Sequence, residues 1–243
     1  MTTPTIALQS TPYLIGVAGP SCAGKTELSR HLARVLDATL LPLDCYYRDL
    51  GDLTLEQRAR FNFDEPSALD HDLFVQHLRD LAAGRAIDRP VYDFATHSRT
   101  TQVERIAPGH SSGQLELPSA DGEAPTALHR EFIVVEGLFV LYWPDVRTLF
   151  GTSVFVHLED QPCLERRIYR DTRERGRTRE SVIRQFTETV QPMAGLYIHP
   201  TRQFADIVVP GDNDIDLSVA TVLNHVQHHL YTAIHKNAGG AGK

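Results

Sequence analysis

The stretch GPSCAGKT, from Gly19 to Thr26, constrains the fold of this chain more than any other segment. It follows a short apolar run at 13–19 and precedes a segment at 25–37 whose apolar residues have helical spacing. The residues fit GxxxxGK followed by Thr, in the order strand, loop, helix that this motif requires. In such a loop the backbone N–H groups surround phosphate oxygens, and the helix N-terminus adds the positive end of its dipole. The sequence therefore predicts a phosphate-binding loop at the edge of an α/β sheet.

This loop predicts a site for a nucleoside triphosphate and a divalent cation. Lys25 is placed to reach the transferred phosphate, and the hydroxyl of Thr26 is placed to bind Mg²⁺. We expect the phosphates to contact the whole loop: Gly19, Pro20, Ser21, Cys22, Ala23, Gly24, Lys25 and Thr26. Glu136 ends the apolar run FIVV, and an acid at a neighbouring strand end is the expected second metal ligand. The simpler alternatives are a glycine-rich turn without a ligand and a carboxylate that only caps a strand.

Apolar runs along the chain predict the rest of the fold. Five of them are continuous rather than alternating, as in parallel strands covered on both faces: 13–19, 39–43, 132–135, 153–158 and 205–209. Apolar spacing places the connecting helices at 69–83, 161–174, 178–197 and 217–235. Parallel strands end at one edge of the sheet, so we expect the phosphate loop, Asp44 and Glu136 to meet there, where open α/β sheets bind ligands. The prediction is a three-layer α/β fold of the P-loop NTPase type with a central parallel sheet.

Composition indicates how the chain is divided. It has 243 residues with 42% hydrophobic content and no compositional break, so we expect a single domain over 1–243. Residues 1–12 are expected to be a leader, and 237–243 a frayed tail. The segment 107–129 is crowded with Pro, Gly and Ser, which predicts a flexible insertion. We expect this insertion to extend an arm around the substrate site.

Net charge and cysteine content restrict the partners. A formal net charge of -7 argues against a general affinity for nucleic acid or anionic membranes. The N-terminus lacks the pattern of a secretory signal, and the longest apolar run, 132–143, is shorter than the roughly 20 residues of a spanning helix. Three cysteines provide no disulfide framework and suit a reducing compartment. We therefore expect a cytoplasmic protein that binds neither nucleic acid nor membrane.

Four further motifs follow the phosphate loop: LDCYYRD at 43–49, FNFDEP at 61–66, PVYDFATHSR at 90–99 and RRIYRDTRERGR at 166–177. In this order they resemble the uridine kinase (uridine-cytidine kinase) family over about 13–210. The resemblance implies transfer of the γ-phosphate of ATP or GTP to the 5′-hydroxyl of uridine and cytidine, which yields UMP and CMP in pyrimidine salvage. It further implies Mg²⁺, a β-hairpin arm, an arginine-rich lid and a homotetramer.

The same resemblance assigns roles to individual residues. Asp44 becomes the catalytic carboxylate, which accepts the proton of the attacking hydroxyl and mainly orients it; the alternative is that it only caps a helical turn. Asp64 holds the ribose hydroxyls, while Phe63 is expected to pack in the core. Contacts to the nucleoside are implied for Tyr47, Tyr92, Phe94 and His97, with Tyr92 and His97 facing the pyrimidine and Phe94 forming a wall. Because a neutral imidazole can donate or accept, His97 could serve both uracil and cytosine.

Seven arginines lie within 166–179, although the protein is acidic overall. By resemblance, Arg170 and Arg175 neutralise the phosphates as catalytic residues, and Arg167, Arg177 and Gln185 contact the nucleoside. Gly176 allows the chain to turn so that the arginines can approach from a lid. Arg166, Arg173 and Arg179 receive no role, because Glu165, Asp171 and Glu174 can pair with them on a solvated helix.

Two alternative functions remain at this point. One is another small-metabolite kinase with the same loop, such as a phosphoribulokinase-like or pantothenate-kinase-like protein. The other is a non-catalytic module that senses ATP and binds a partner through its arginines. The aromatic residues of PVYDFATHSR favour a flat base as the substrate, and the combination of Lys25, Asp44 and Glu136 favours catalysis.

Overall fold

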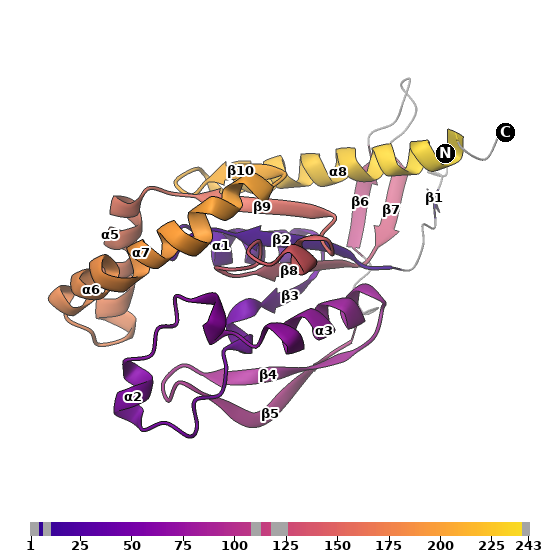
Figure 1. Cartoon of the computed structure of the whole chain (residues 1–243). Helices are drawn as coiled ribbons and strands as arrows, with labels where there is room; N and C mark the ends of the chain where they lie inside the picture. The colour runs from indigo at the N-terminus through magenta and orange to yellow at the C-terminus, as the bar shows by residue number, and fades with distance from the viewer. Residues whose placement is uncertain (1–4, 7–10, 108–112, 118–125, 240–243) are drawn as a thin grey trace.

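The computed structural model describes residues 5–6, 11–107, 113–117 and 126–239. Its central sheet has five parallel strands in the order β10-β9-β2-β8-β3 (Figure 1). They are β2 (Tyr13–Ala18), β3 (Thr39–Pro42), β8 (Phe132–Glu136), β9 (Thr152–His157) and β10 (Ile207–Pro210). The inner strands β2, β8 and β9 are buried almost throughout, whereas β10 is a half-exposed edge. The predicted parallel sheet is confirmed.

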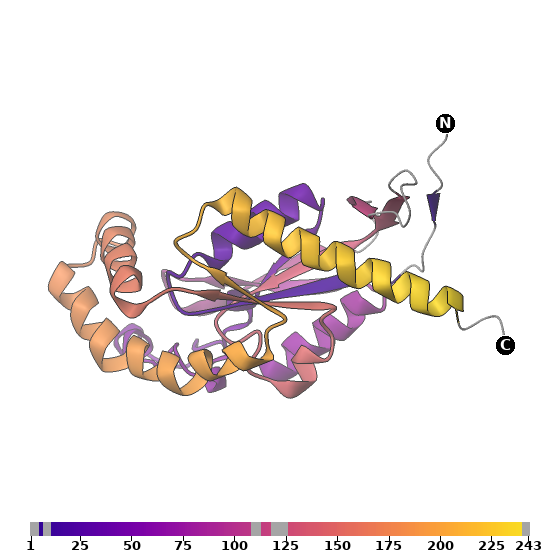
Figure 2. The ribbon, with the colours of Figure 1, turned by 90° about the horizontal axis from the view of Figure 1, so that it is seen from above.

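Helices cover both faces of this sheet, which confirms the three-layer fold. Figure 2 shows α1 (Lys25–Val35) and α8 (Ile215–Gly239) on one side, and α3 (His71–Ala82) and α4 (Pro144–Arg147) on the other. Because neighbouring side chains of a strand point to opposite faces, β2 contributes Ile15 to one apolar cluster and Leu14 to the other.

A long helical segment between β9 and β10 carries the predicted lid. After α5 (Asp160–Glu174) and α6 (Arg179–Gln185), the helical path continues through η3 (Phe186–Val190), α7 (Gln191–Met193), η4 (Ala194–Ile198) and η5 (His199–Phe204). The prediction of one regular helix over 178–197 was therefore wrong in length and regularity. Two π-helical turns flank Pro192, which has no N–H to continue the regular hydrogen-bond pattern.

The expected β-hairpin arm is formed by β4 (Ile87–Asp93) and β5 (Ser98–Ile106), which pair antiparallel from Ile87↔Ile106 to Asp93↔Ser98. In β4 the residues Ile87, Pro90 and Tyr92 are buried, with a shift of register between Pro90 and Tyr92, whereas β5 is mostly exposed. Three short elements connect the arm and α3 to the sheet: η1 (Leu43–Tyr46), α2 (Leu55–Ala59) and η2 (Pro66–Ala68).

The expectation of a flexible insertion over 107–129 is wrong for the residues that the structure describes there. Strands β6 (Gly113–Leu117) and β7 (Thr126–Arg130) pair antiparallel, and β7 also pairs in parallel with β1 (Thr5–Ile6). Leu115, Leu117 and Leu128 are buried in the apolar cluster that includes α8. The Gln227 side-chain amide donates to the Glu116 carbonyl oxygen at 2.9 Å. The alternation of Leu115, Glu116 and Leu117 is a strand pattern, which the surrounding Pro, Gly and Ser obscured.

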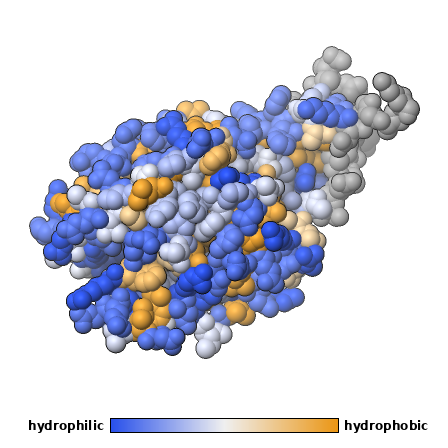
Figure 3. Space-filling model, in the orientation of Figure 1, coloured by the Kyte–Doolittle hydropathy of each residue, from blue (hydrophilic) through white to orange (hydrophobic). Residues whose placement is uncertain are grey.

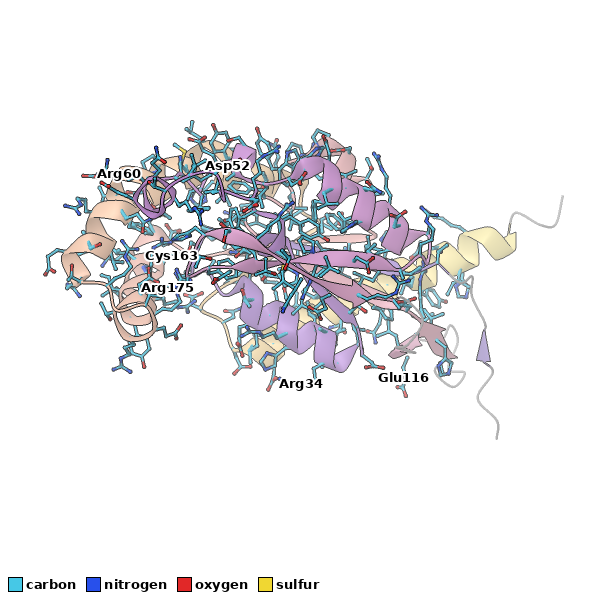
Figure 4. All side chains as sticks on the ribbon, turned by 90° about the horizontal axis from the view of Figure 1, so that it is seen from below. Arg34, Asp52, Arg60, Glu116, Cys163 and Arg175 are labelled. Carbon is cyan, nitrogen blue, oxygen red and sulfur yellow. The ribbon has the colours of Figure 1, made fainter. Side chains whose placement is uncertain are left out.

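The position of these strands also contradicts the expected extension of the arm. They lie at the end of the sheet away from α5 and α6 (Figure 1), and Figure 4 shows Glu116 and Arg175 at opposite ends of the molecule. Residues 108–112 and 118–125, most of the predicted leader (1–4 and 7–10) and the tail residues 240–243 lie outside the described residues.

The surface of the protein that Figure 3 shows is mostly hydrophilic, as the charged residues of the chain lead one to expect. Hydrophilic side chains cover most of the face in Figure 3, and the hydrophobic ones form small groups. Within the described ranges, the longest helices lack the continuous apolar length that crossing a bilayer requires.

We predict that Leu128→Ala lowers the free energy of unfolding by roughly 2–5 kcal/mol, because it removes a fully buried side chain. Glu116→Ala, an exposed position on the same hairpin, is the control and should change it by less than about 0.5 kcal/mol. Urea denaturation followed by circular dichroism measures both variants. Equal stability of Leu128→Ala and the wild type would mean that these strands do not pack on the core.

Candidate active site

The phosphate-binding loop joins β2 to α1 and has the backbone geometry that the motif predicts. Gly19 and Gly24 have φ angles of 146° and 109°, which side-chain-bearing residues rarely adopt. A Cβ on Gly19 would overlap the carbonyl oxygen of Val156 in the neighbouring strand β9. Lys25 is buried, and its Nζ donates to the Pro20 carbonyl oxygen at 2.9 Å. The ammonium therefore lies against the loop at the N-terminus of α1.

Three strand ends place polar side chains next to this loop. In the sheet, Val17 and Pro42 both lie opposite Glu136, so β2, β8 and β3 end at the same edge. The Thr26 hydroxyl is 3.4 Å from each carboxylate oxygen of Glu136. Asp44 follows β3 within η1, half-buried. The structure thus brings together the residues for which the sequence predicted a common edge.

The charges of this edge affect one another. Burial raises the pKa of Asp44 above its ordinary value, while the charges of Lys25, Arg175 and Arg170 act in the opposite direction. Burial also raises the pKa of Glu136 and lowers that of Lys25, and each of the two charges partly offsets the shift of the other. The site therefore holds two carboxylates that additional positive charge would stabilise.

The donor atoms suit Mg²⁺, which prefers hydroxyl and carboxylate oxygens and retains several of its waters. Thr26 is an exposed residue in the first turn of α1, and its hydroxyl lies beside the buried carboxylate of Glu136 at the end of β8. This pair fits the metal site that the sequence predicts.

Aromatic side chains form a box beside Asp44. The ring of Tyr47 lies 5.3 Å from Phe63 and 5.6 Å from Tyr92, measured between centroids. His97 stacks on Phe63 at 4.9 Å with an angle of 25° between the rings. Phe94 contacts the edge of Tyr92 and remains 54% exposed, so one of its faces is open to a ligand. Phe63, which the sequence assigned to packing alone, stands in this box.

Three polar side chains in or beside the box, Tyr92, His97 and Asp64, have properties that suit contact with a ligand. The Tyr92 hydroxyl is shielded from solvent and has no hydrogen-bond partner within the described part of the chain, and burial raises its pKa to about 12. The pKa of His97 is lowered by burial and by the charges of Arg175 and Arg58, so its imidazole is neutral at pH 7. Burial raises the pKa of Asp64, which lies within electrostatic reach of Arg167 and Asp44. A buried group without a partner is a natural contact for a polar substrate.

The arginines of the lid gather around one carboxylate, Asp171, which is fully buried. Its oxygens lie within ion-pair distance of Arg167 (3.7 Å), Arg170 (2.9 Å), Arg175 (3.7 Å) and Arg177 (3.3 Å). The sequence analysis placed Asp171 with the arginines that received no role, but it pairs with the four that did. Its spacing of four residues from Arg167 and from Arg175 on a helix was the signal that could have revealed this.

Further hydrogen bonds connect the lid to the loop. Arg167 donates to the Ser21 hydroxyl at 3.0 Å and to the Gln185 side-chain oxygen at 3.1 Å, and Arg177 donates to the same oxygen at 2.5 Å. Gly176 has a φ of 61°, as the turn between α5 and α6 requires. The lid residues assigned to the nucleoside therefore form one network with the phosphate loop.

Arg166, which the sequence analysis left without a role, lies beside the phosphate loop. Its guanidinium donates to the Gly211 carbonyl oxygen at 3.0 Å. It lines a cavity of about 240 Å³ next to the phosphate loop, together with Gly24, Asn213 and Ser218. Arg173 instead packs over the ring of Tyr169, away from this cavity.

Comparison with known proteins agrees with this geometry. The model of the phosphoribulokinase/uridine kinase family matches residues 14–218. The chain belongs to this family. It is 38% identical to a uridine kinase of Chloroflexus aggregans over 226 residues, which cover 92% of this chain and 98% of that protein. It is also 38% identical to a uridine kinase of Vibrio cholerae over 215 residues, with coverages of 85% and 91%.

Two solved structures of kinases have a fold similar to that of this chain. Phosphoribulokinase from Rhodobacter spheroides gives a TM-score of 0.57 at 15% identity, over 84% of this chain and 74% of that one. D-glycerate 3-kinase from Cryptococcus neoformans gives 0.55 at 16% identity, with coverages of 84% and 88%. At these identities the likeness concerns the architecture alone.

We predict that Asp171→Asn lowers the free energy of unfolding by about 2 kcal/mol. This is less than the roughly 3–5 kcal/mol for a fully buried ion pair, because three of the four arginines are partly solvated. Glu174→Gln, an exposed position in the same helix, should have almost no effect. Chemical denaturation of both variants measures the difference, and equal stabilities would show that Asp171 does not hold the arginines together.

Proposed function

We propose that this protein transfers the γ-phosphate of ATP to the 5′-hydroxyl of uridine and cytidine, yielding UMP and CMP. One observation carries the proposal: the carboxylate of Asp44 lies within electrostatic reach both of Lys25 in the phosphate loop and of Tyr47, whose ring is a wall of the aromatic box. Relatives named uridine kinase align along almost the whole chain and support it.

The donor nucleotide would occupy the loop between β2 and α1. Its phosphates would accept hydrogen bonds from the N–H groups of Gly19–Thr26, with Lys25, Arg170 and Arg175 offsetting their negative charge. Its base would enter the cavity lined by Arg166 and Asn213. Thr26 and Glu136 would hold Mg²⁺, which when bound neutralises charge on the phosphates. GTP remains a second candidate donor.

The acceptor nucleoside would lie between Asp44 and the arm. Asp64 would accept hydrogen bonds from the two ribose hydroxyls, which leaves the 5′-hydroxyl directed towards Asp44. Asp44 would accept the proton of that hydroxyl as its oxygen attacks the γ-phosphorus. Because bond making to the nucleophile is slight in a loose transition state, the main contribution of Asp44 is to orient the hydroxyl.

The base would stand among Tyr47, Phe63, Tyr92 and Phe94, whose rings form apolar walls for a flat heterocycle. A neutral His97 can donate to the 4-oxo group of uracil or accept from the 4-amino group of cytosine, according to its tautomer. The unpartnered Tyr92 hydroxyl offers a second polar contact.

The lid would link acceptor binding to chemistry. The charge of Arg175 acts on both Asp44 and His97, so this arginine stands between the phosphate and nucleoside halves of the site. With Arg167, Arg177 and Gln185 closing over the nucleoside, water would be excluded from the γ-phosphate.

An assay of ADP release tests the proposal against both alternatives. The substrates are uridine, cytidine, ribulose 5-phosphate and pantothenate, each with ATP and Mg²⁺. Turnover with the two nucleosides is the expected result. Turnover with ribulose 5-phosphate or pantothenate alone would support another acceptor, and ATP binding without turnover of any substrate would support a sensing module.

We predict that Asp44→Asn lowers kcat for uridine by about 10²–10⁴-fold, because the hydroxyl loses its acceptor and orienting partner. The affinity for ATP, measured by calorimetry, should remain within a few fold of the wild type. Asp52→Asn, an exposed position nearby in the chain, should leave both quantities unchanged. A kcat of Asp44→Asn within about threefold of wild type would remove this residue from the reaction.

The lowered pKa of His97 predicts a pH effect on specificity. Its folded-state pKa lies below 6.5, so the neutral form persists at neutral pH and is lost only as the pH falls below that value. A protonated imidazole donates only, and the 4-amino group of cytosine donates too, so KM should rise more for cytidine than for uridine in acid. At pH 7.5 the two values of kcat/KM should differ by less than about a hundredfold. A parallel rise of KM for both nucleosides would exclude His97 as the contact.

A further inference from the structure

Arg99 has no role in the reaction described so far, although it belongs to the motif PVYDFATHSR. It is the second residue of β5, and in the hairpin it lies directly opposite Tyr92. Its side chain is only 18% exposed, unlike most of this outer strand. Arg99 makes contacts outside the arm, with the segment that follows Asp44.

The guanidinium of Arg99 binds three acceptors. Its Nε donates to the Tyr47 carbonyl oxygen at 2.8 Å, and its Nη2 donates to the Tyr46 carbonyl oxygen at 3.1 Å. Its Nη1 donates to the Asp70 carboxylate at 3.0 Å. The backbone N–H of Arg99 also donates to the Asp49 carboxylate at 3.2 Å. Four hydrogen bonds thus connect one residue of the arm to 46–49 and to the start of α3.

The segment that Arg99 holds carries two site residues. Asp44 lies in the same 3₁₀ turn as Tyr46, and the ring of Tyr47 forms a wall of the aromatic box. From the other side, the Asp70 N–H donates to the Tyr46 carbonyl at 2.9 Å and the Arg48 N–H donates to the Ala68 carbonyl at 2.8 Å. Residues 46–48 are therefore fixed between 68–70 and the guanidinium of Arg99.

We propose that Arg99 is a positioning residue that couples the nucleoside arm to Asp44. This inference rests on the proposed function. Tyr92 and Arg99 face each other across the hairpin, so a nucleoside that packs against Tyr92 also sets the position of Arg99. Arg99 in turn fixes the carbonyl groups of Tyr46 and Tyr47, and through them the turn that presents Asp44 to the 5′-hydroxyl.

The chemistry of the side chain matches this task. A planar guanidinium presents its N–H donors in a rigid fork, so three acceptors are held at fixed angles. A lysine ammonium keeps the charge for Asp70 but cannot reproduce the fork. The other arginine of β5, Arg105, pairs with Asp88 inside the hairpin and is 68% exposed. Arg105 is therefore the matched control, with the same charge and strand but no contact to 46–49.

The experiment compares Arg99→Gln, Arg99→Lys and Arg105→Gln with the wild type. We measure kcat and KM for uridine, the Kd for uridine without ATP by calorimetry, and hydrogen exchange of backbone amides by mass spectrometry. Arg99→Gln should lower kcat at least tenfold while Kd changes less than threefold, because the pocket remains and Asp44 loses its alignment. Arg99→Lys should lie between, and exchange should accelerate at 44–48 in both Arg99 variants. Arg105→Gln should stay within twofold of wild type throughout.

Several results would overturn the inference. An unchanged kcat in Arg99→Gln would do so, as would a loss of uridine binding as large as the loss of kcat, since the residue would then only fold the arm. Faster exchange throughout the central sheet would likewise show a general structural role. If the wild type itself does not turn over uridine, the proposed function fails instead. Hydrogen exchange then decides about Arg99 alone: acceleration confined to 44–48 supports the coupling, and its absence refutes it.

Discussion

The parallel pairing of β2, β8 and β3 is the constraint on which the rest of this site depends. In that register Glu136 lies between Val17 and Pro42, so the three strands stop together. The phosphate loop begins immediately after β2, and Asp44 follows β3 after a single residue. Asp44 and Lys25, which are distant in the sequence, thereby become neighbours in the structure.

The lid carries a cluster of positive charges, although the protein as a whole is negatively charged. The net charge of the chain is -7, yet four arginines of the lid surround the buried carboxylate of Asp171. Bringing so many cations together without a counter-charge would be unfavourable in a partly desolvated site. Asp171, a residue of α5, supplies that counter-charge.

The errors of the sequence-based predictions have local causes. The strand pattern at 115–117 is too short to outweigh the Pro, Gly and Ser around it, and its burial depends on α8, which lies more than a hundred residues later. The helix predicted over 178–197 is irregular because two π-helical turns flank Pro192, which has no backbone N–H, and the helical path continues beyond 197 as the 3₁₀ segment η5. Arg166 and Asp171 were missed because a helix crowded with charges does not reveal which partners are buried.

The sequence by itself determined the five strands of the central sheet and their main connecting helices. It also determined the chemistry of the loop, because a glycine-rich turn between an apolar strand and an amphipathic helix is typical of phosphate binding. It also indicated Asp44, His97 and the arginine cluster as candidates. Only the tertiary structure decided that Arg99 binds the carbonyl groups of Tyr46 and Tyr47, and that β6 and β7 lie far from the lid. Backbone carbonyls look the same at every position of a sequence, so which of them a guanidinium meets is settled only when distant segments pack together.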